Sequence, residues 1–434
     1  MNSLNTIAIL AVLLSAVAVL PGTLGILMLT NRIAASPSGA RFIYFQSGAL
    51  ISFALMLLIY ALYRSAAGGT YSTIVVGSSI AVLLLLTYGF LMHAKMLFRP
   101  IRKPIFISAR EALDKFGPDE EVVGVIDSKG NPYAFIARLA RRPHIVYQAQ
   151  GDAPFIMTHC ILAHSSMSYA LEGNFRNPDI TITAALANNM VFYDKSSRSS
   201  VVQIHNRLEG SDEPLLTVPT VMTSLKSWRK HYPDSPVWMR PVEWRDIFYL
   251  KMLARADVID PASAVMVYPL QHELDERLPM KSLVLGVLWG KHSRAYPIAT
   301  IADRETINDK LGSMHLAILC LDDFVQIFDR RVDGSAILTF GKATSSDHFV
   351  DAETGSEWTA TGACVSGAYE GRQLSAIPHY NKIFWYVWSD YFPNGEIFGE
   401  SGFDKNKADK RAQQIYRVNV ASPKPATVFT DTLD

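Results

Sequence analysis

Three long apolar runs open the chain, and a longer part follows in which short apolar segments alternate with polar turns. The runs cover residues 4–29, 42–63 and 71–92, and none of them contains an acidic or basic side chain. Each exceeds the roughly 20 residues that cross a bilayer as a helix. No basic region precedes the first run, as it would in a cleaved signal peptide. We therefore predict a transmembrane anchor of three helices within residues 1–103.

The pattern changes to that of a β-rich fold after residue 104. Residues 121–127 and 133–137 are apolar segments on either side of Gly130, which predicts a hairpin, and further short strands are separated by Gly, Asn, Asp and Pro. Helical spacing of apolar side chains occurs over Val221–His231, Val242–Ala254 and Ile383–Tyr391. The expected fold class is a membrane-anchored α+β protein.

A set of residues recurs at nearly constant spacing between the two halves of this part. Three pairs are 160 positions apart, Cys160 with Cys320, Trp228 with Trp388 and Pro233 with Pro393, and three more are 157 to 163 apart, Gly124 with Gly286, Tyr133 with Tyr296 and Asp194 with Asp351. A fixed offset with small insertions indicates an internal repeat. We predict two tandem, pseudo-symmetric β-rich domains over 104–241 and 282–400, joined by a connector over 242–281 and followed by a polar tail over 401–434.

The charges are divided unevenly along the chain. Residues 1–103 carry seven basic side chains and no acidic one, whereas the remainder has a net charge of −6. An acidic soluble part repels phosphate backbones, which argues against nucleic-acid binding. Six of the seven basic residues fall on one side of the predicted spans, and this bias predicts an outside N-terminus and a cytoplasmic soluble part.

The second half resembles the bacterial family called domain of unknown function 3179. The resemblance rests on Phe328–Phe340, on Asp351–Trp358, on Phe384–Pro393, and on Arg294–Pro297 with Ile307–Asp309. It implies no activity, because none is attached to the family. Members are often exported, which makes the periplasm the alternative location for the soluble part.

One departure from the family concerns its cysteines. The resemblance implies a Tyr-Cys-Pro-Leu-Cys pair in the first half, able to hold a metal or to cycle as a dithiol. Here Cys160 remains, but the second cysteine is replaced by Ala163, and the corresponding positions of the second half hold Cys320 and Asp323. Neither half contains a Cys-x-x-Cys unit.

The candidate metal ligands are His159, Cys160 and His164, because imidazole and thiolate are the groups that copper and zinc prefer. Strand alternation would place Cys160 and His164 on one face, so a third ligand such as His144 or His205 would come from elsewhere. The alternative is that Cys160 is a buried small hydrophobe and that no cofactor is bound.

A second candidate region combines Cys320 with the carboxylates of Asp322, Asp323 and Asp351. Turn formation explains such aspartates equally well. The chain contains no nucleophile elbow, phosphate loop, dinucleotide fingerprint or His-Glu-x-x-His motif, and we assign no catalytic residue.

These observations favour a non-enzymatic accessory or scaffold subunit of a larger bacterial inner-membrane complex. Its expected partners are the lipid bilayer and other integral membrane subunits. The first alternative is a membrane-tethered metal- or ligand-binding protein that uses a cleft between the repeats, around Cys160, His164, Cys320 and Asp323. The second is an enzyme of unrecognised type that uses Asp322, Asp323 and Asp351.

Overall fold

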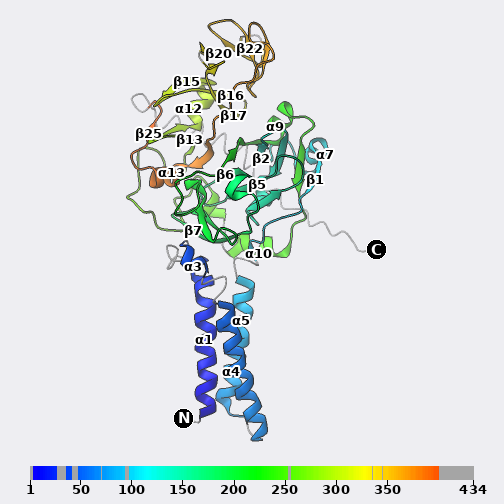
Figure 1. The fold of residues 1–434 in the computed structure, drawn as a ribbon, viewed down its shortest axis with the longest axis vertical. Helices are drawn as coiled ribbons and strands as arrows, with labels where there is room; N and C mark the ends of the chain where they lie inside the picture. Colours follow the sequence, from blue (N-terminus) through cyan, green and yellow to red (C-terminus); the bar gives the residue numbers. More distant parts are fainter. Residues whose placement is uncertain are drawn as a thin grey trace.

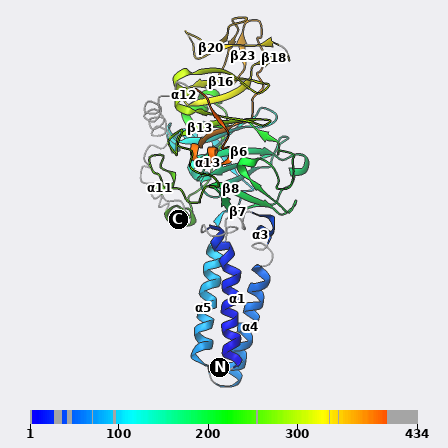
Figure 2. The ribbon, with the colours of Figure 1, turned by 90° about the vertical axis from the view of Figure 1, so that its left-hand side faces the viewer.

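A rod of apolar helices carries a β-rich body in the computed structural model (Figure 1, Figure 2). The structure describes residues 3–26, 36–41, 47–69, 71–92, 97–252, 256–334, 336–344 and 346–399, so the predicted tail over 401–434 lies outside it. The helices of the N-terminal part are α1 (Ser3–Ile26), α3 (Pro37–Arg41), α4 (Ser47–Ala67) and α5 (Thr73–Met92). α1 begins at the end of the rod far from the body.

Two of these helices are long and apolar enough to cross a membrane, Gly48–Ala67 and Thr73–Leu91. They correspond to the predicted spans over 42–63 and 71–92, although residues 42–46 lie outside the described part. The prediction of three spans is corrected to two. The apolar stretch of α1, Ser3–Val19, is shorter than the roughly 20 residues that a bilayer requires, and Pro21 and Gly22 follow it.

α1 is the central helix of the rod, and it packs against both α4 and α5. Small side chains make this approach close: Ala8 is buried with Ala61 of α4, and Ala11 with Val82 of α5. A Cβ atom added at Gly89 of α5 would lie 2.6 Å from a methyl group of Val19. Helices in an apolar solvent associate through such close packing because they gain little from the hydrophobic effect.

The first sheet of the body has five strands in the order β1-β12-β3-β2-β11, and β12 pairs with β3 in parallel. Its strands are β1 (Ile105–Ser108), β2 (Glu121–Ile126), β3 (Pro132–Ile136), β11 (Thr220–Ser224) and β12 (Pro236–Met239). The helices beside it are α7 (Ala109–Phe116), α8 (Ala137–Ala140) and α9 (Leu225–His231). The predicted helix over Val221–His231 therefore begins too early, because Val221–Ser224 pair with β2 and the Ser224 hydroxyl caps α9.

The second sheet has eight strands and joins early to late parts of the chain. Its order is β25-β14-β13-β24-β6-β5-β4, with β10 also paired to β6, and β14 and β25 are parallel. The strands are β4 (Ile145–Gln148), β5 (Phe155–Cys160), β6 (Ser165–Ala170), β10 (Thr217–Val218), β13 (Leu283–Trp289), β14 (His292–Pro297), β24 (Tyr380–Phe384) and β25 (Glu396–Ile397). Within this sheet, the early and late strands pair at Asn381 of β24 and Ser166 of β6.

Smaller sheets and helices complete the body. The three-stranded sheets are β7 (Ile180–Leu186), β8 (Asn189–Asp194) and β9 (Ser199–Val202), and β15 (Thr306–Leu311), β16 (Met314–Leu321) and β17 (Phe324–Asp329). Short strands follow as β18 (Arg331–Val332), β19 (Ala336–Ile337), β20 (Phe340–Lys342), β21 (Phe349–Asp351), β22 (Glu357–Trp358) and β23 (Cys364–Ser366). The remaining helical segments are η2 (Gly173–Phe175), η3 (Gln203–His205), α10 (Trp244–Met252), α11 (Ala256–Ile259), α12 (Ile298–Arg304) and α13 (Trp385–Tyr391).

Two tryptophans pack their helices directly against glycines of the sheets. A Cβ atom at Gly124 of β2 would lie 2.0 Å from the ring of Trp228 of α9, and one at Gly286 of β13 would lie 2.2 Å from the ring of Trp388 of α13. Both indoles are fully buried. Only glycine allows this approach, so each pair fixes how closely its helix packs on its sheet.

Candidate functional site

Five charged and polar side chains lie together where β24 meets β6, four of them buried and Asp323 partly buried. Glu121 begins β2, His159 lies in β5, His164 lies in the turn before β6, Asp323 lies in the turn before β17, and Lys382 lies in the middle of β24. Four elements far apart in the sequence thus place their polar groups at one junction. We call these five residues the junction cluster.

Lys382 is the most enclosed member of the junction cluster. Its side chain is 1% exposed, and its backbone is left-handed with φ of 52°. The ammonium nitrogen lies 3.9 Å from an oxygen of Glu121 and 3.9 Å from an oxygen of Asp323. Among the described residues it has no hydrogen-bond partner. A buried cation in this state is held by charge attraction alone, at a cost in lost hydration.

Glu121 supplies the balancing negative charge. Its carboxylate lies 3.4 Å from Nε2 of His164, whose Nδ1–H donates to the carbonyl oxygen of Lys382 at 2.9 Å. Burial alone would raise the pKa of Glu121, but the facing His164 and Lys382 outweigh burial and lower this pKa to about 2. Glu121 is therefore ionised throughout the physiological range.

His159 is the neutral neighbour of this charged group. Its ring centroid lies 6.4 Å from that of His164, and its Nδ1 is 2.9 Å from the hydroxyl oxygen of Ser166. Burial and the nearby His164 lower the pKa of His159 well below its ordinary value.

Asp323 connects the second half of the body to the N-terminus of α9 in the first half. Its carboxylate accepts hydrogen bonds from the hydroxyl of Thr223 at 2.9 Å, from the hydroxyl of Ser224 at 3.0 Å and from the backbone N–H of Ser224 at 2.6 Å. These donors lie immediately before α9, where an anion is favoured by the helix dipole. The carboxylate is thereby used to join the two halves.

The cysteines predicted as ligands are buried thiols with other partners. Cys160 donates to the carbonyl oxygen of Asn188 at 3.7 Å, and burial raises its pKa to about 11. Cys320 donates to the carbonyl oxygen of Asp322 at 3.5 Å, and burial together with the Asp323 carboxylate raises its pKa to about 12. Both remain protonated at neutral pH, whereas metal binding and nucleophilic attack require the thiolate.

The structure brings some of the predicted site residues together and separates others. His159, His164 and Asp323 meet in the junction cluster, and Cys320 borders it. Asp322 is exposed and pairs with Lys230 at 3.2 Å, whereas the buried Asp351 accepts from Thr354 and from the indole of Trp358. Within the described residues, no three His, Cys, Asp or Glu side chains are grouped so that they could hold a metal ion.

Sequence reasoning missed Glu121 and Lys382. Glu121 ends the acidic run Asp119-Glu120-Glu121, and Lys382 follows the polar residues His379 and Asn381, so neither charge stands out from its neighbours in the sequence. Both charges lie in strands that are largely buried, and a buried charge requires a partner, because an unpaired one is strongly unfavourable. The partner itself could not be read from either strand alone.

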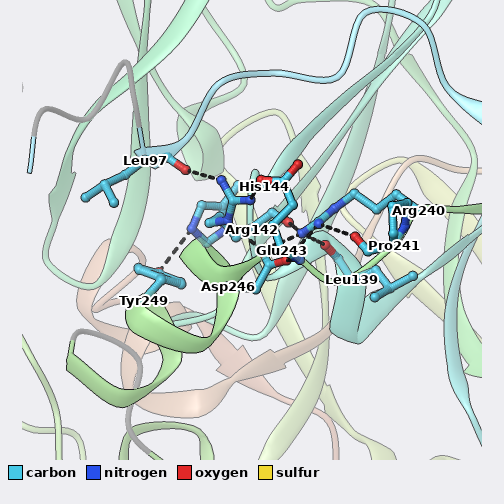
Figure 3. Close-up of polar contacts among 9 residues, drawn as sticks. All are labelled: Leu97, Leu139, Arg142, His144, Arg240, Pro241, Glu243, Asp246 and Tyr249. Carbon is cyan, nitrogen blue, oxygen red and sulfur yellow. Dashed lines mark hydrogen bonds and ion pairs between the residues drawn. The ribbon is translucent and has the colours of Figure 1, made fainter. Parts of the chain in front are cut away.

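A second polar network lies at the base of the body and is centred on Arg142 (Figure 3). The Arg142 guanidinium donates to the carbonyl oxygen of Leu97 at 2.9 Å, to Asp246 of α10 at 2.5 Å and to Glu243 at 2.6 Å. Arg240 donates to the same Asp246 at 2.6 Å and 2.8 Å. We call these five residues the basal joint.

The charges of the basal joint are paired; three of them are buried, and Glu243 is half-exposed. The side chains of Arg142, Arg240 and Asp246 are 7%, 9% and 8% exposed. Burial opposes ionisation of Asp246, but hydrogen bonds from Arg240, from the Glu243 N–H and from Arg142 hold its pKa below the usual value. Two cations and two carboxylates therefore tie the chain before β1, the end of α8 and the start of α10 into one unit.

His144 links the basal joint to the junction cluster. Its Nδ1–H donates to the carbonyl oxygen of His159 at 2.9 Å. Its Nε2 accepts from the hydroxyl of Tyr249 in α10 at 3.1 Å (Figure 3). Burial lowers the pKa of His144 to about 4, so the imidazole is neutral, as this arrangement requires.

An open depression of about 560 Å³ lies in the second half, where Asp329, Arg331, Asp333 and Arg372 line it. Asp329 pairs with Arg331 at 2.5 Å, and Asp333 pairs with Arg372 at 3.4 Å. The opposite charges neutralise each other, so the depression offers no net charge to a ligand.

Among curated proteins and among solved structures, nothing matches the chain. One family model does match, over residues 99–395, and its description is "Protein of unknown function (DUF3179)". The match begins after the apolar helices and includes the junction cluster and all of the basal joint except Leu97. It spans well over half of the chain, and the protein therefore belongs to this family.

Proposed function

We propose that the protein is a non-enzymatic accessory subunit of a bacterial inner-membrane complex, which holds its β-rich body in a fixed position above the bilayer. The observation that carries this proposal is the basal joint. A mostly buried set of paired charges connects the segment after α5 to α8 and α10. A tether that only kept an enzyme near the membrane would need no such connection.

Other contacts between rod and body support a fixed orientation. α1 contacts β7, and α3 contacts β9. The chain passes from Met92 at the end of α5 to Leu97 in the basal joint over only five residues. Such a span reaches at most about 18 Å, so it leaves little freedom for the body to move away from α5.

We also propose that the two halves of the body are tandem, pseudo-symmetric domains. The orders β12-β3-β2-β11 and β25-β14-β13-β24 correspond strand by strand, with a parallel pair at the same place. In each half one tryptophan packs directly on one glycine, Trp228 on Gly124 and Trp388 on Gly286. The N–H groups of Leu225 and Lys226 donate to carbonyl oxygens 105 and 108 positions upstream, and those of Trp385 and Tyr386 donate to carbonyl oxygens 103 and 106 positions upstream.

The junction cluster fits a role in holding these domains together. Asp323 of the second half accepts from the N–H of Ser224, and Ala163 of the first half accepts from the N–H of Phe384. The contacts are reciprocal, as in an interface between two copies of one unit. A rigid pair of domains offers a defined surface to a partner.

The membrane placement is part of the proposal. α4 and α5 would span the inner membrane, with α1 packed between them, and the basic residues near the body would place it in the cytoplasm, with the periplasm as the alternative. Impermeant labelling of a cysteine introduced at Ser36 in intact cells distinguishes the two sides.

Purification from native membranes in mild detergent tests the accessory role. We expect integral membrane subunits to be recovered in fixed stoichiometry with the full-length chain. Recovery of a lone monomer from several detergents would refute the role, because a subunit held by apolar helix faces should keep its partners under gentle conditions.

A ligand-binding role is the second candidate, and one observation favours it. Within the part of the chain that the structure describes, the buried Lys382 ammonium has no hydrogen-bond partner. An anionic ligand that entered between the halves would satisfy it better than copper or zinc would, because a cation repels metal ions. Thermal stability should then rise with phosphate or small carboxylates in the wild type and not in Lys382→Met. Equal responses in both proteins would remove this candidate.

A further inference from the structure

α10 has two chemically different faces. Asp246 and Tyr249 are buried against the body, where they bind the basal joint and His144. On the outer side, Val242 before the helix and Trp244 and Ile247 within it are 56%, 61% and 52% exposed. Trp244 and Ile247 are three residues apart, so they form an exposed apolar surface on one face of the helix. We call it the α10 apolar face.

The position of α10 is fixed relative to the membrane helices. It lies at the base of the body, at the end that faces the rod (Figure 1). Its Asp246 is bonded to Arg142, and Arg142 in turn binds the Leu97 carbonyl oxygen, five residues after the last residue of α5. This chain of contacts keeps α10 near the level at which α5 leaves the bilayer.

We propose that the α10 apolar face inserts into the lipid headgroup region of the leaflet facing the body. The inference rests on the proposed membrane spans of α4 and α5, because these helices set the level of the bilayer. An amphipathic helix at this level buries its apolar face at the boundary between headgroups and acyl chains. Tryptophan is the residue most typical of that boundary.

The charges beside the α10 apolar face agree with a lipid surface. The Arg245 guanidinium lies 5.1 Å from the Trp244 ring, and Lys251 is exposed at the other end of the helix. Both cations can reach lipid phosphates. The acidic residues of this region, Glu243 and Asp246, are paired with Arg142 and do not oppose that contact.

Tryptophan fluorescence tests the proposal. All seven tryptophans lie between Trp228 and Trp388, so none is inside the membrane rod, and only Trp244 and Trp289 are exposed. The full-length protein is reconstituted in phosphatidylcholine nanodiscs with and without bromine on the acyl chains. We expect bromine to quench the wild type, Trp244→Phe to lose at least half of this quenching, and the matched control Trp289→Phe to retain it.

Each other outcome is informative. Wild-type protein that enters nanodiscs but is not quenched, or Trp244→Phe that is quenched as strongly as the wild type, would overturn the proposal. The first of these results would leave a protein partner as the occupant of the α10 apolar face. Failure of the protein to enter nanodiscs at all would instead refute the spans of α4 and α5.

Discussion

Replacing Gly286 by alanine should displace the Trp388 indole from its position against β13. The new Cβ atom would meet three ring carbons at 2.2, 2.4 and 2.6 Å, whereas carbon atoms pack at about 3.5–4.0 Å. The ring would have to retreat by more than about 1 Å. Trp388 is fully buried in α13, so the ring cannot move without the helix. Overpacking of this kind costs about 1–3 kcal/mol.

Gly341→Ala is the matched control for this variant. Gly341 also lies in a strand, but a Cβ atom there would meet nothing within 4 Å. Both variants share the lower chain entropy of alanine in the unfolded state, so the difference between their free energies of unfolding isolates the clash. We expect Gly286→Ala to be the less stable by about 1–3 kcal/mol, measured by denaturant unfolding in detergent.

A double variant shows whether the indole is the cause. Trp388→Phe removes ring atoms that the new methyl group would meet, so combining it with Gly286→Ala should restore part of the lost stability, with a coupling above about 0.5 kcal/mol. Equal stabilities of Gly286→Ala and Gly341→Ala, or purely additive effects in the double variant, would refute the reasoning.

Three further predictions concern buried polar groups. Asp246→Asn removes the negative charge that faces two buried arginines and should lower the free energy of unfolding by roughly 3 kcal/mol. The control Asp347→Asn, in the exposed ion pair with Lys230, should not change the free energy of unfolding measurably. Equal effects of the two variants would contradict this prediction. Cys160 and Cys320 should resist maleimide at pH 7 until the protein is denatured, and rapid labelling of the folded protein would show that the thiols are accessible. The pKa of His144 is about 4 in the folded protein against 6.5 in the unfolded chain, so the contribution of His144 to the free energy of unfolding is complete above pH 6.5 and falls by about 3 kcal/mol as the pH drops to 4. His144→Asn should therefore reduce the pH dependence of the free energy of unfolding between pH 6.5 and 4. An unchanged pH dependence in this variant would refute the assignment.

The strands were predictable because short apolar segments rich in Val, Ile and aromatic residues are bounded by turn residues in the local sequence. The hairpin expected over 121–127 and 133–137 is β2 and β3, and the helix expected over Val242–Ala254 is α10. The helix expected over Ile383–Tyr391 begins only at Trp385, because Ile383 and Phe384 pair with β13. Pairing between distant segments thus overrode a local helical pattern, as it did at Val221.

The site was less predictable because its members are joined only by tertiary contacts. His164 was assigned to a strand and Asp323 to a turn, but Lys382, which contacts both, lies 218 and 59 residues away from them. The left-handed conformation of His164, with φ of 49°, also removes it from the strand alternation used to orient it. No periodicity in the sequence records such a turn.

The pairing of β24 with β6 has a consequence for synthesis. The Ser165–Ser166 end of β6 has no partner on one edge until Asn381, 215 residues after Ser166, leaves the ribosome. At about 5–20 residues per second this delay is roughly 10–40 s. During that time the strand presents an open edge, the feature that recruits chaperones or other nascent chains. A fragment truncated before β24 should therefore aggregate rather than fold, and production of the protein should depend on how quickly its last hundred residues are made.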